Sequence, residues 1–198
     1  MARRVADGAP PAPPALPRRP TPDELRDAVH RTIRDVVAPG LDVLFCGINP
    51  GLWSGATGHH FARPGNRFWP TLHAAGFTDR QLAPFEERLL LARGLGITNV
   101  VRRTTATADQ LAPEELVAGG RRLARLVRRH RPRVLAVLGI GAYRTAFARS
   151  RAGLGLQEET IGATRLWVLP NPSGLNANYQ RAELARLFGE LREWVGRG

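Results

Sequence analysis

The segment 41–51, with the sequence LDVLFCGINPG, constrains the fold more than any other part of the chain. Its apolar run over residues 43–47 is typical of a strand that is buried on both faces of a sheet. The run ends at Asn49-Pro50-Gly51, where the proline disfavours helical geometry for Asn49 and the glycine permits a sharp turn. Open α/β sheets present polar side chains at such strand ends, so Asn49 is a candidate site residue. The alternative is that Asn49 only closes a turn.

Apolar runs alternate with helical patterns along the rest of the chain. Strands are predicted at residues 97–101, 134–138 and 166–169 in addition to 43–47. Helices are predicted from a capping box at Thr21 and Glu24 up to Pro39-Gly40, and over residues 67–75, 84–93, 113–130, 142–148 and around 184–194. Residues 52–65 are expected to form a long loop, and such loops are often functional. The alternation predicts a three-layer α/β/α sandwich with a mainly parallel central sheet.

The length of 198 residues indicates one sizeable domain rather than two. Residues 1–20 contain six prolines and four arginines but hardly any large apolar side chain. Such a composition cannot bury enough surface to order itself, so a disordered tail is expected there. The single domain is expected to span residues 21–198.

The formal net charge of +12 favours a polyanionic partner, and nucleic acid is the commonest soluble one. The sequence contains no lysine, so all 29 basic side chains are arginines, set against 17 acids. A codon-level bias toward arginine is an alternative origin of this composition, but the excess positive charge acts electrostatically in either case.

The single cysteine, Cys46, lies inside the apolar run 43–47. One cysteine excludes an intramolecular disulfide, a zinc site built on cysteines and an iron–sulfur cluster held by this chain alone. Cys46 is therefore expected to be a small core hydrophobe. No apolar run is as long as a membrane span, and the start MARR lacks a signal-peptide pattern, so a cytoplasmic protein is expected.

The asparagine-proline turn that follows the strand at residues 43–47 has a counterpart later in the chain. Residues 47–51 (the first turn) and 170–174 (the second turn, Pro-Asn-Pro-Ser-Gly) both follow an apolar strand and both place an asparagine before a proline. In a parallel sheet both turns lie at the same edge, so Asn49 and Asn171 are expected to face one cleft.

In this combination the sequence resembles the mismatch-specific uracil-DNA glycosylases, the family that also contains the eukaryotic thymine-DNA glycosylases. The resemblance covers nearly all of residues 35–195, and the pair GINPG and NPSGL is highly specific. The other similar motifs are GHHFARPGNRFW (58–69), GITN (96–99) and LPNPSGLN (169–176). It implies a uracil-DNA glycosylase-like fold and double-stranded DNA with G·U mismatches as the partner. We expect a nucleoid-associated monomer without cofactor, metal or membrane contact.

The resemblance also implies roles for individual residues. Asn49 is the catalytic residue, Phe61 stacks on the extruded base, and Leu175 is the wedge that fills the vacated stack. Gly174 and Asn176 lie against the orphaned guanine, with Ser173 beside them. The remaining residues of the base pocket are Gly47, Ile48, Ser54, His60 and Asn171. From the residues alone, Phe61 could instead pack under its loop and Leu175 could be an ordinary exposed leucine.

The sequence departs from the bacterial members at a few positions. His59 and His60 are similar to the eukaryotic branch, whereas NPSGL is similar to the bacterial one. Asn176-Ala177 replaces the Ser-Arg of the bacterial pattern, and Trp53 has no counterpart with an obvious role. The resemblance also implies that Ser54 lies beside the pyrimidine 5-carbon. A hydroxyl there would crowd a methyl group, so uracil is expected to be processed better than thymine. His60 could act in the opposite direction.

The chemistry of an asparagine is compatible with the implied role of Asn49. Its amide does not titrate near neutral pH and cannot act as a general base. It can accept one hydrogen bond from a water and donate another, which places the water beneath the sugar carbon. This is sufficient if the base departs early and the sugar gains oxocarbenium character. Slow turnover with little dependence on pH between about 5.5 and 8 is therefore predicted.

The absence of lysine has its own consequence. Bifunctional glycosylases cleave the strand through a Schiff base, for which lysine is the usual nucleophile. This chain offers only its N-terminal amine, so a monofunctional enzyme that leaves an abasic site is predicted.

Three other patterns have weaker functional interpretations. Gly139-Ile140-Gly141 is unlike a dinucleotide loop because Arg144 occupies the position of the third glycine. His59-His60 lacks the carboxylate or thiol partners of a metal site. The densest basic run is expected to line a solvated helix face, with a phosphate-contacting stripe as the alternative. It consists of Arg121, Arg122, Arg125, Arg128, Arg129, Arg131 and Arg133.

Two functional hypotheses follow. The first is a hydrolase that excises uracil, and possible related pyrimidines such as thymine or exocyclic-adduct cytosine, from mismatched duplex DNA. The second is a DNA-damage binding module with the same fold and little catalysis. The presence of Asn49 favours the enzyme, because a pure binding module has no need of an amide that holds water.

Overall fold

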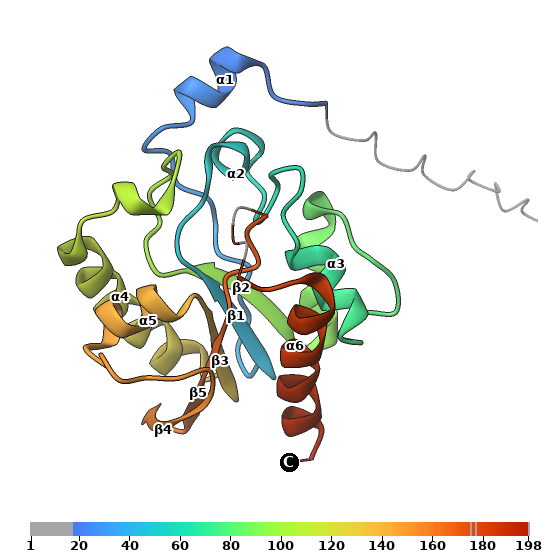
Figure 1. The fold of residues 1–198 in the computed structure, drawn as a ribbon, viewed down its shortest axis with the longest axis vertical. Coiled ribbons are helices and arrows are strands. Elements are labelled where there is room, and N and C mark those ends of the chain that lie inside the picture. The colour runs from blue at the N-terminus through green and yellow to red at the C-terminus, as the bar shows by residue number, and fades with distance from the viewer. Residues whose placement is uncertain (1–17, 175, 177, 198) are drawn as a thin grey trace, which may run out of the picture.

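Five strands form the central sheet in the order β2-β1-β3-β5-β4 (Figure 1). They are β1 (Val43–Gly47), β2 (Leu95–Asn99), β3 (Val134–Leu138), β4 (Gly155–Ile161) and β5 (Thr164–Leu169). All neighbouring strands are parallel except β4, which is antiparallel to β5 at one edge. The computed structural model describes residues 18–174, 176 and 178–197. The predicted α/β/α sandwich with a mainly parallel sheet is confirmed.

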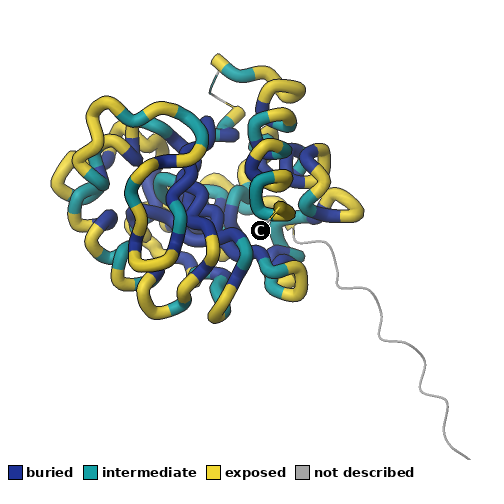
Figure 2. The backbone as a smooth tube through the Cα atoms, turned by 90° about the horizontal axis from the view of Figure 1, so that it is seen from below, coloured by how far each residue is buried: buried dark blue, intermediate teal, exposed yellow. Residues whose placement is uncertain are grey.

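Alternate side chains of each strand face opposite layers of helices. Val43 and Phe45 belong to a core cluster shared with α3 and α6, whereas Leu44 and Cys46 pack in the cluster of α4 and α5. These helices are α3 (Phe68–Ala74), α6 (Arg181–Gly196), α4 (Pro113–His130) and α5 (Ile140–Phe147). Figure 2 shows the resulting buried centre enclosed by exposed helices and loops. Cys46 is fully buried and unpaired, as predicted, and burial raises the pKa of its thiol.

The long loop expected at residues 52–65 is only partly a loop. Its first six residues form α2 (Leu52–Thr57), which begins after Gly51 and ends at Gly58. Gly58 has a φ of 77°, a left-handed conformation that glycine adopts without steric cost. The helix predicted at residues 84–93 is present as a 3-10 helix, η1 (Pro84–Arg93), and a second such turn is η2 (Ala108–Gln110).

The N-terminal helix is much shorter than the sequence pattern predicted. The capping box of α1 (Pro22–Asp27) is confirmed, since Glu24 N donates to Thr21 Oγ1 at 3.2 Å and Thr21 N to Glu24 Oε2 at 2.8 Å. The prediction that the helix continues toward Pro39 is wrong. Val36 instead exchanges two backbone hydrogen bonds of 2.8 Å with Ile97. The free edge of β2 thus satisfies the backbone of this segment better than a helix end would.

Two further differences concern strands. β2 begins and ends two residues earlier than predicted, and β4 was not predicted at all. β4 carries polar residues on its exposed side and lies at the sheet edge, where an apolar run is not required. The bounds predicted for α4 and β3 are those observed. The disordered tail predicted for residues 1–20 lies outside the described residues, except for its last three.

The register of the parallel strands brings three connecting segments to one edge of the sheet. Gly47 lies opposite Asn99 in the β1–β2 pair, and Leu138 lies opposite Leu169 in the β3–β5 pair. The chain therefore leaves β1, β2 and β5 at the same edge. No helix in the described part of the chain has the length and apolar character needed to cross a membrane.

Candidate active site

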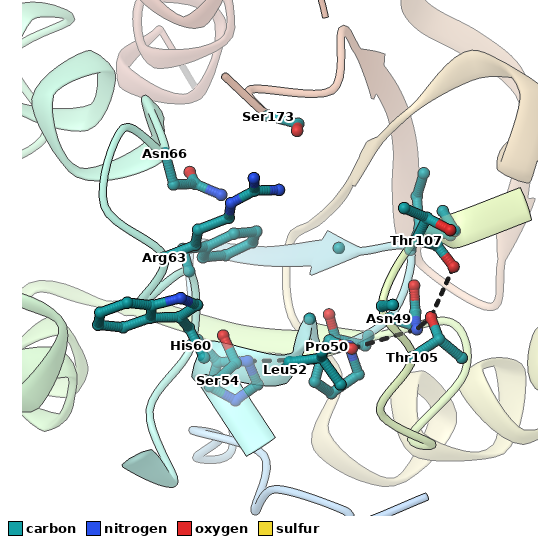
Figure 3. A pocket seen from close by; sticks show the side chains of 18 of the residues that line it. Asn49, Pro50, Leu52, Ser54, His60, Arg63, Asn66, Thr105, Thr107 and Ser173 are labelled. Atoms are coloured by element: carbon teal, nitrogen blue, oxygen red, sulfur yellow. Dashed lines mark hydrogen bonds between the residues drawn. The ribbon is translucent and has the colours of Figure 1, made fainter. Parts of the chain in front are cut away.

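A cavity of about 680 Å³ opens at this edge of the sheet (Figure 3). Its walls come from the first turn, from α2 and the loop after it, from the segment after β2 and from the second turn. Nine of the residues predicted from the sequence line it: Gly47, Ile48, Asn49, Ser54, His60, Phe61, Asn171, Ser173 and Asn176. Gly174 does not line the cavity, and Leu175 lies outside the described residues.

Asn49 is held from behind by the segment that follows β2. Its Nδ2 donates to Thr105 Oγ1 at 2.6 Å, to the Arg103 carbonyl at 3.1 Å and to the Pro50 carbonyl at 3.2 Å. A carbonyl only accepts, and Thr105 Oγ1 already donates to the Thr107 carbonyl at 2.8 Å, so the amide nitrogen must face this segment. No described residue donates a hydrogen bond to Asn49 Oδ1. Because Asn49 lines the cavity, this oxygen is an acceptor available to a ligand or water.

The support for Asn49 extends to the start of α4. The Arg103 guanidinium pairs with both oxygens of Glu115 at 2.8 Å, and Glu115 also accepts from the Ala112 backbone at 3.0 Å. These contacts lower the pKa of Glu115 to about 2. The backbones are joined as well, since Thr105 N donates to the Pro50 carbonyl at 3.1 Å. The first turn is therefore fixed by contacts distant in sequence, none of which the sequence predicted.

Phe61 forms an apolar wall of the cavity. Its ring stacks on the buried Phe68, with centroids 4.1 Å apart and planes 23° apart, which leaves the other face toward the cavity side. Phe61 has a φ of 54°, a conformation that non-glycine residues rarely adopt. A Cβ at Gly47 would lie 3.2 Å from the Phe61 ring and 2.5 Å from Asn99 Oδ1. The close approach of these two side chains thus requires glycine at position 47.

His60 is buried, with both ring nitrogens beside polar groups of the protein. Its Nε2 lies 3.0 Å from the Arg34 carbonyl, which only accepts, so Nε2 carries a proton; in the neutral ring Nδ1 then accepts from Asn99 Nδ2 at 3.2 Å. Burial lowers the pKa of His60, and its backbone N–H donates to Glu87 Oε2 at 2.8 Å. Both ring nitrogens are therefore engaged within the protein. In this arrangement His60 orients Asn99 and offers no free nitrogen to a ligand.

Asn99 is a site residue that the sequence interpretation missed. It ends β2, directly opposite Gly47, and lines the cavity with its Oδ1 on the Gly47 side. The available signal was its position as a polar residue at a strand's carboxyl end, within the motif GITN, as for Asn49 and Asn171.

The side chains of Asn171 and Asn176 bond to the backbone of the second turn. Asn171 Oδ1 accepts from the Ser173 backbone N–H at 3.0 Å, and Asn176 Nδ2 donates to the Asn171 carbonyl at 3.0 Å. Ser54, on α2, accepts from the Ala62 backbone N–H at 3.3 Å and so links α2 to the loop that carries Phe61.

One arginine, Arg63, and one aspartate, Asp109, line the cavity. Arg63 is exposed, lines the cavity and makes no hydrogen bond or ion pair with any described residue through its guanidinium (Figure 3). In the basic run of α4, Arg122 is not part of a solvated face, because it bonds to the Asn99 carbonyl and pairs with Asp35. His59 Nδ1 lies 3.1 Å from Glu87 Oε1. The described residues contain no group of three or more side chains suited to hold a metal ion.

Comparisons with known proteins identify the superfamily and the fold. A family model described as the uracil DNA glycosylase superfamily matches residues 34–194. Among solved structures, the chain is similar to a solution NMR structure from Methanosarcina acetivorans, of a protein described as a candidate uracil DNA glycosylase. The two share 19% sequence identity with a TM-score of 0.54 over 83% of this chain and 99% of that chain. At this level of identity the likeness concerns the fold.

Proposed function

The chain belongs to the uracil DNA glycosylase superfamily, and on this premise we propose that it excises uracil mispaired with guanine from double-stranded DNA. It hydrolyses the N-glycosidic bond and leaves an abasic site. The observation that carries the proposal is the fixed amide of Asn49, whose nitrogen is bound by the protein while its oxygen stays open in the cavity that Phe61 also lines.

The substrate base must leave the duplex before it reaches this cavity. Extrusion costs a few kcal/mol and is least costly for a mispaired base, so a U·G pair opens more readily than U·A. The volume of about 680 Å³ lies in the range of small-molecule sites, which supports the entry of a flipped pyrimidine. The free face of Phe61 stacks on the ring of that pyrimidine.

Asn99 supports the choice of uracil over cytosine. Its Nδ2 is bound to His60, so its Oδ1 is turned toward the space over Gly47. An amide oxygen there accepts a hydrogen bond from the N3–H of uracil, whereas N3 of cytosine is itself an acceptor. Selection against a base without this N–H is strong, because the buried polar group of the protein is then left unpaired.

Hydrolysis proceeds by positioning of water. Asn49 Oδ1 accepts a hydrogen bond from a water molecule and directs its oxygen at the sugar carbon C1′. The bond between C1′ and the base nitrogen breaks with its electron pair passing to the base, and the sugar gains oxocarbenium character. The bond from the water oxygen to C1′ then forms, and the surplus proton passes to the leaving base or to solvent. Since both donors of Asn49 are already engaged, only its acceptor takes part, in contrast to the donating role expected from the sequence.

Two further properties belong to the proposal. Uracil is preferred over thymine, because the Ser54 side chain would crowd a 5-methyl group. The enzyme is monofunctional, because the chain contains no lysine that could form a Schiff base with the sugar. Borohydride reduction during the reaction should give no covalent protein–DNA adduct, and a trapped adduct would contradict monofunctional hydrolysis.

The proposal is tested with end-labelled duplexes that contain one U·G, U·A or T·G pair, followed by alkali to cut abasic sites. We expect cleavage in the order U·G, U·A, T·G, and almost none for 3-methyluracil opposite guanine, which lacks the N3–H. The Asn49→Ala protein, purified in the same way, controls for a contaminating glycosylase. Binding to the U·G duplex without cleavage would identify a DNA-damage binding module instead, and equal cleavage by both proteins would contradict the mechanism.

A further inference from the structure

One arginine at the start of α3 donates hydrogen bonds to backbone carbonyls of the second turn and of residues shortly after it. The Arg67 backbone N–H donates to the Pro172 carbonyl at 3.0 Å. Its guanidinium donates to the carbonyls of Ser173 at 2.6 Å and Asn176 at 2.7 Å. Further donations reach the carbonyls of Pro172 and Tyr179. Four carbonyls of an irregular segment therefore converge on one side chain.

Only an arginine supplies this pattern of donors. A guanidinium has five N–H groups in a rigid plane, whereas a lysine ammonium has three donors around a single point. Arg67 makes no ion pair with any described carboxylate, so its charge is directed at the carbonyl dipoles of the segment. Backbone carbonyls in a loop without secondary structure need such partners when water is excluded.

The same segment packs closely against the loop that carries Phe61. A Cβ placed on Gly174 would lie 2.6 Å from the Gly65 carbonyl, two residues before Arg67. Phe68, directly after Arg67, is the residue on which Phe61 stacks. Contacts at Gly65, Arg67 and Phe68 therefore connect the base pocket to the second turn. Arg67 itself does not line the cavity.

We propose that Arg67 is a positioning residue that holds residues 171–174 and Asn176 in the shape that engages the duplex and couples this engagement to base capture beside Phe61. The inference rests on the proposed function, and it adds a role to a residue outside the cavity. Because Arg67 acts through the second turn, its loss impairs extrusion of a base from a duplex. Chemistry on a base that is already unpaired is affected much less.

The direct test compares Arg67→Lys and Arg67→Met with the wild type on uracil in a U·G duplex and in a single strand. We expect both variants to lose about tenfold or more on the duplex, the size of effect for a lost charge-assisted hydrogen bond, and to change little on the single strand. Arg88→Met is the matched control, because Arg88 is an exposed arginine of η1 that neither lines the cavity nor belongs to the basic run of α4. Equal losses on both substrates by a folded variant would overturn the inference.

A second readout does not depend on catalysis. In the Asn49→Ala background, a 2-aminopurine beside the uracil should brighten when saturating protein extrudes the base. Adding Arg67→Lys should reduce this amplitude. Gly174→Ala should also reduce it, because the new Cβ would push the second turn away from the Gly65 carbonyl. An unchanged amplitude in both would overturn the inference. If the wild type releases uracil, only the coupling has then failed. If the wild-type protein releases no uracil and the Asn49→Ala protein gives no fluorescence increase, the proposed function fails as well.

Discussion

The two asparagine-proline turns at the carboxyl edge of the sheet look alike in sequence but use their side chains in opposite ways. In the first turn, the Asn49 amide reaches across to Arg103 and Thr105 and keeps its oxygen open at the cavity. In the second turn, the Asn171 oxygen accepts from the backbone of Ser173, two residues further along. The first amide thus leaves an acceptor open at the cavity, and the second is used within its own turn.

This difference arises from the neighbours of each turn. β1 lies between β2 and β3, so the segment after β2 runs alongside the first turn and receives its amide donors. The second turn has its backbone held by Arg67 and by Asn176. An asparagine whose side-chain hydrogen bonds all lie within its own turn shapes that turn, whereas Asn49 is held mainly by the distant Arg103 and Thr105 and keeps its oxygen free.

The largest expected effect separates the two asparagines directly. Asn49→Ala should lower the single-turnover rate of uracil release by about 100-fold or more, as for the loss of a group that positions the attacking atom. Asn171→Ala should lower it by less than about tenfold, because only a local turn hydrogen bond is lost. Rates measured with saturating protein on a U·G duplex test this pair. Equal losses at both positions would remove the distinction between the turns.

A smaller effect is expected for the residue behind Asn49. Thr105→Val removes the hydroxyl that accepts from Asn49 Nδ2 while keeping the shape of the side chain, and should slow uracil release by about tenfold. Thr105→Ser keeps the hydroxyl and is the matched control, with a rate near that of the wild type. A wild-type rate for Thr105→Val would show that the carbonyls of Arg103 and Pro50 hold the amide sufficiently without the hydroxyl.

The sequence predicted the place of the site better than the contacts within it. Asn49, Phe61 and Asn171 line one cavity as predicted, because parallel strands bring their carboxyl ends to one edge. Their catalytic and binding roles stay predictions. Thr105 and Arg67 were missed, because they act through hydrogen bonds to groups far away in the sequence, which leave no periodic pattern.

The fold shows the same limit. α4 was predicted to its ends because it begins at Pro113 and keeps one apolar face through Val127. Residues 28–36 also have helical spacing, but their backbone bonds to β2 at Val36 and to Thr104, after β2, at His30 and Arg31. These tertiary contacts override the local pattern. Val29, predicted on the apolar face, is accordingly 42% exposed.

The pH dependence of uracil release tests whether the group at position 49 acts as a neutral amide. Between about pH 5.5 and 8 the rate should vary by less than about threefold, because an amide has no proton to lose there. Burial lowers the pKa of His60, which favours the neutral form of this ring. In Asn49→Asp an acid limb should appear, with the rate falling as the new carboxyl is protonated. An acid limb in the wild type that Asp109→Asn removes would instead assign the chemistry to that carboxylate, which also borders the cavity.

The smallest expected effect comes from the isosteric change at the second turn. Asn171→Asp keeps the oxygen that accepts from Ser173 N–H, so urea denaturation should give a free energy of unfolding close to the wild-type value. Asn171→Ala should cost about 1 kcal/mol, the usual net contribution of one such hydrogen bond. Asn49→Asp removes the N–H donors that bond to Arg103 and Thr105, so it should lower the free energy of unfolding more than Asn171→Asp does. Equal tolerance of aspartate at both positions would mean that the donors of Asn49 contribute little to holding it.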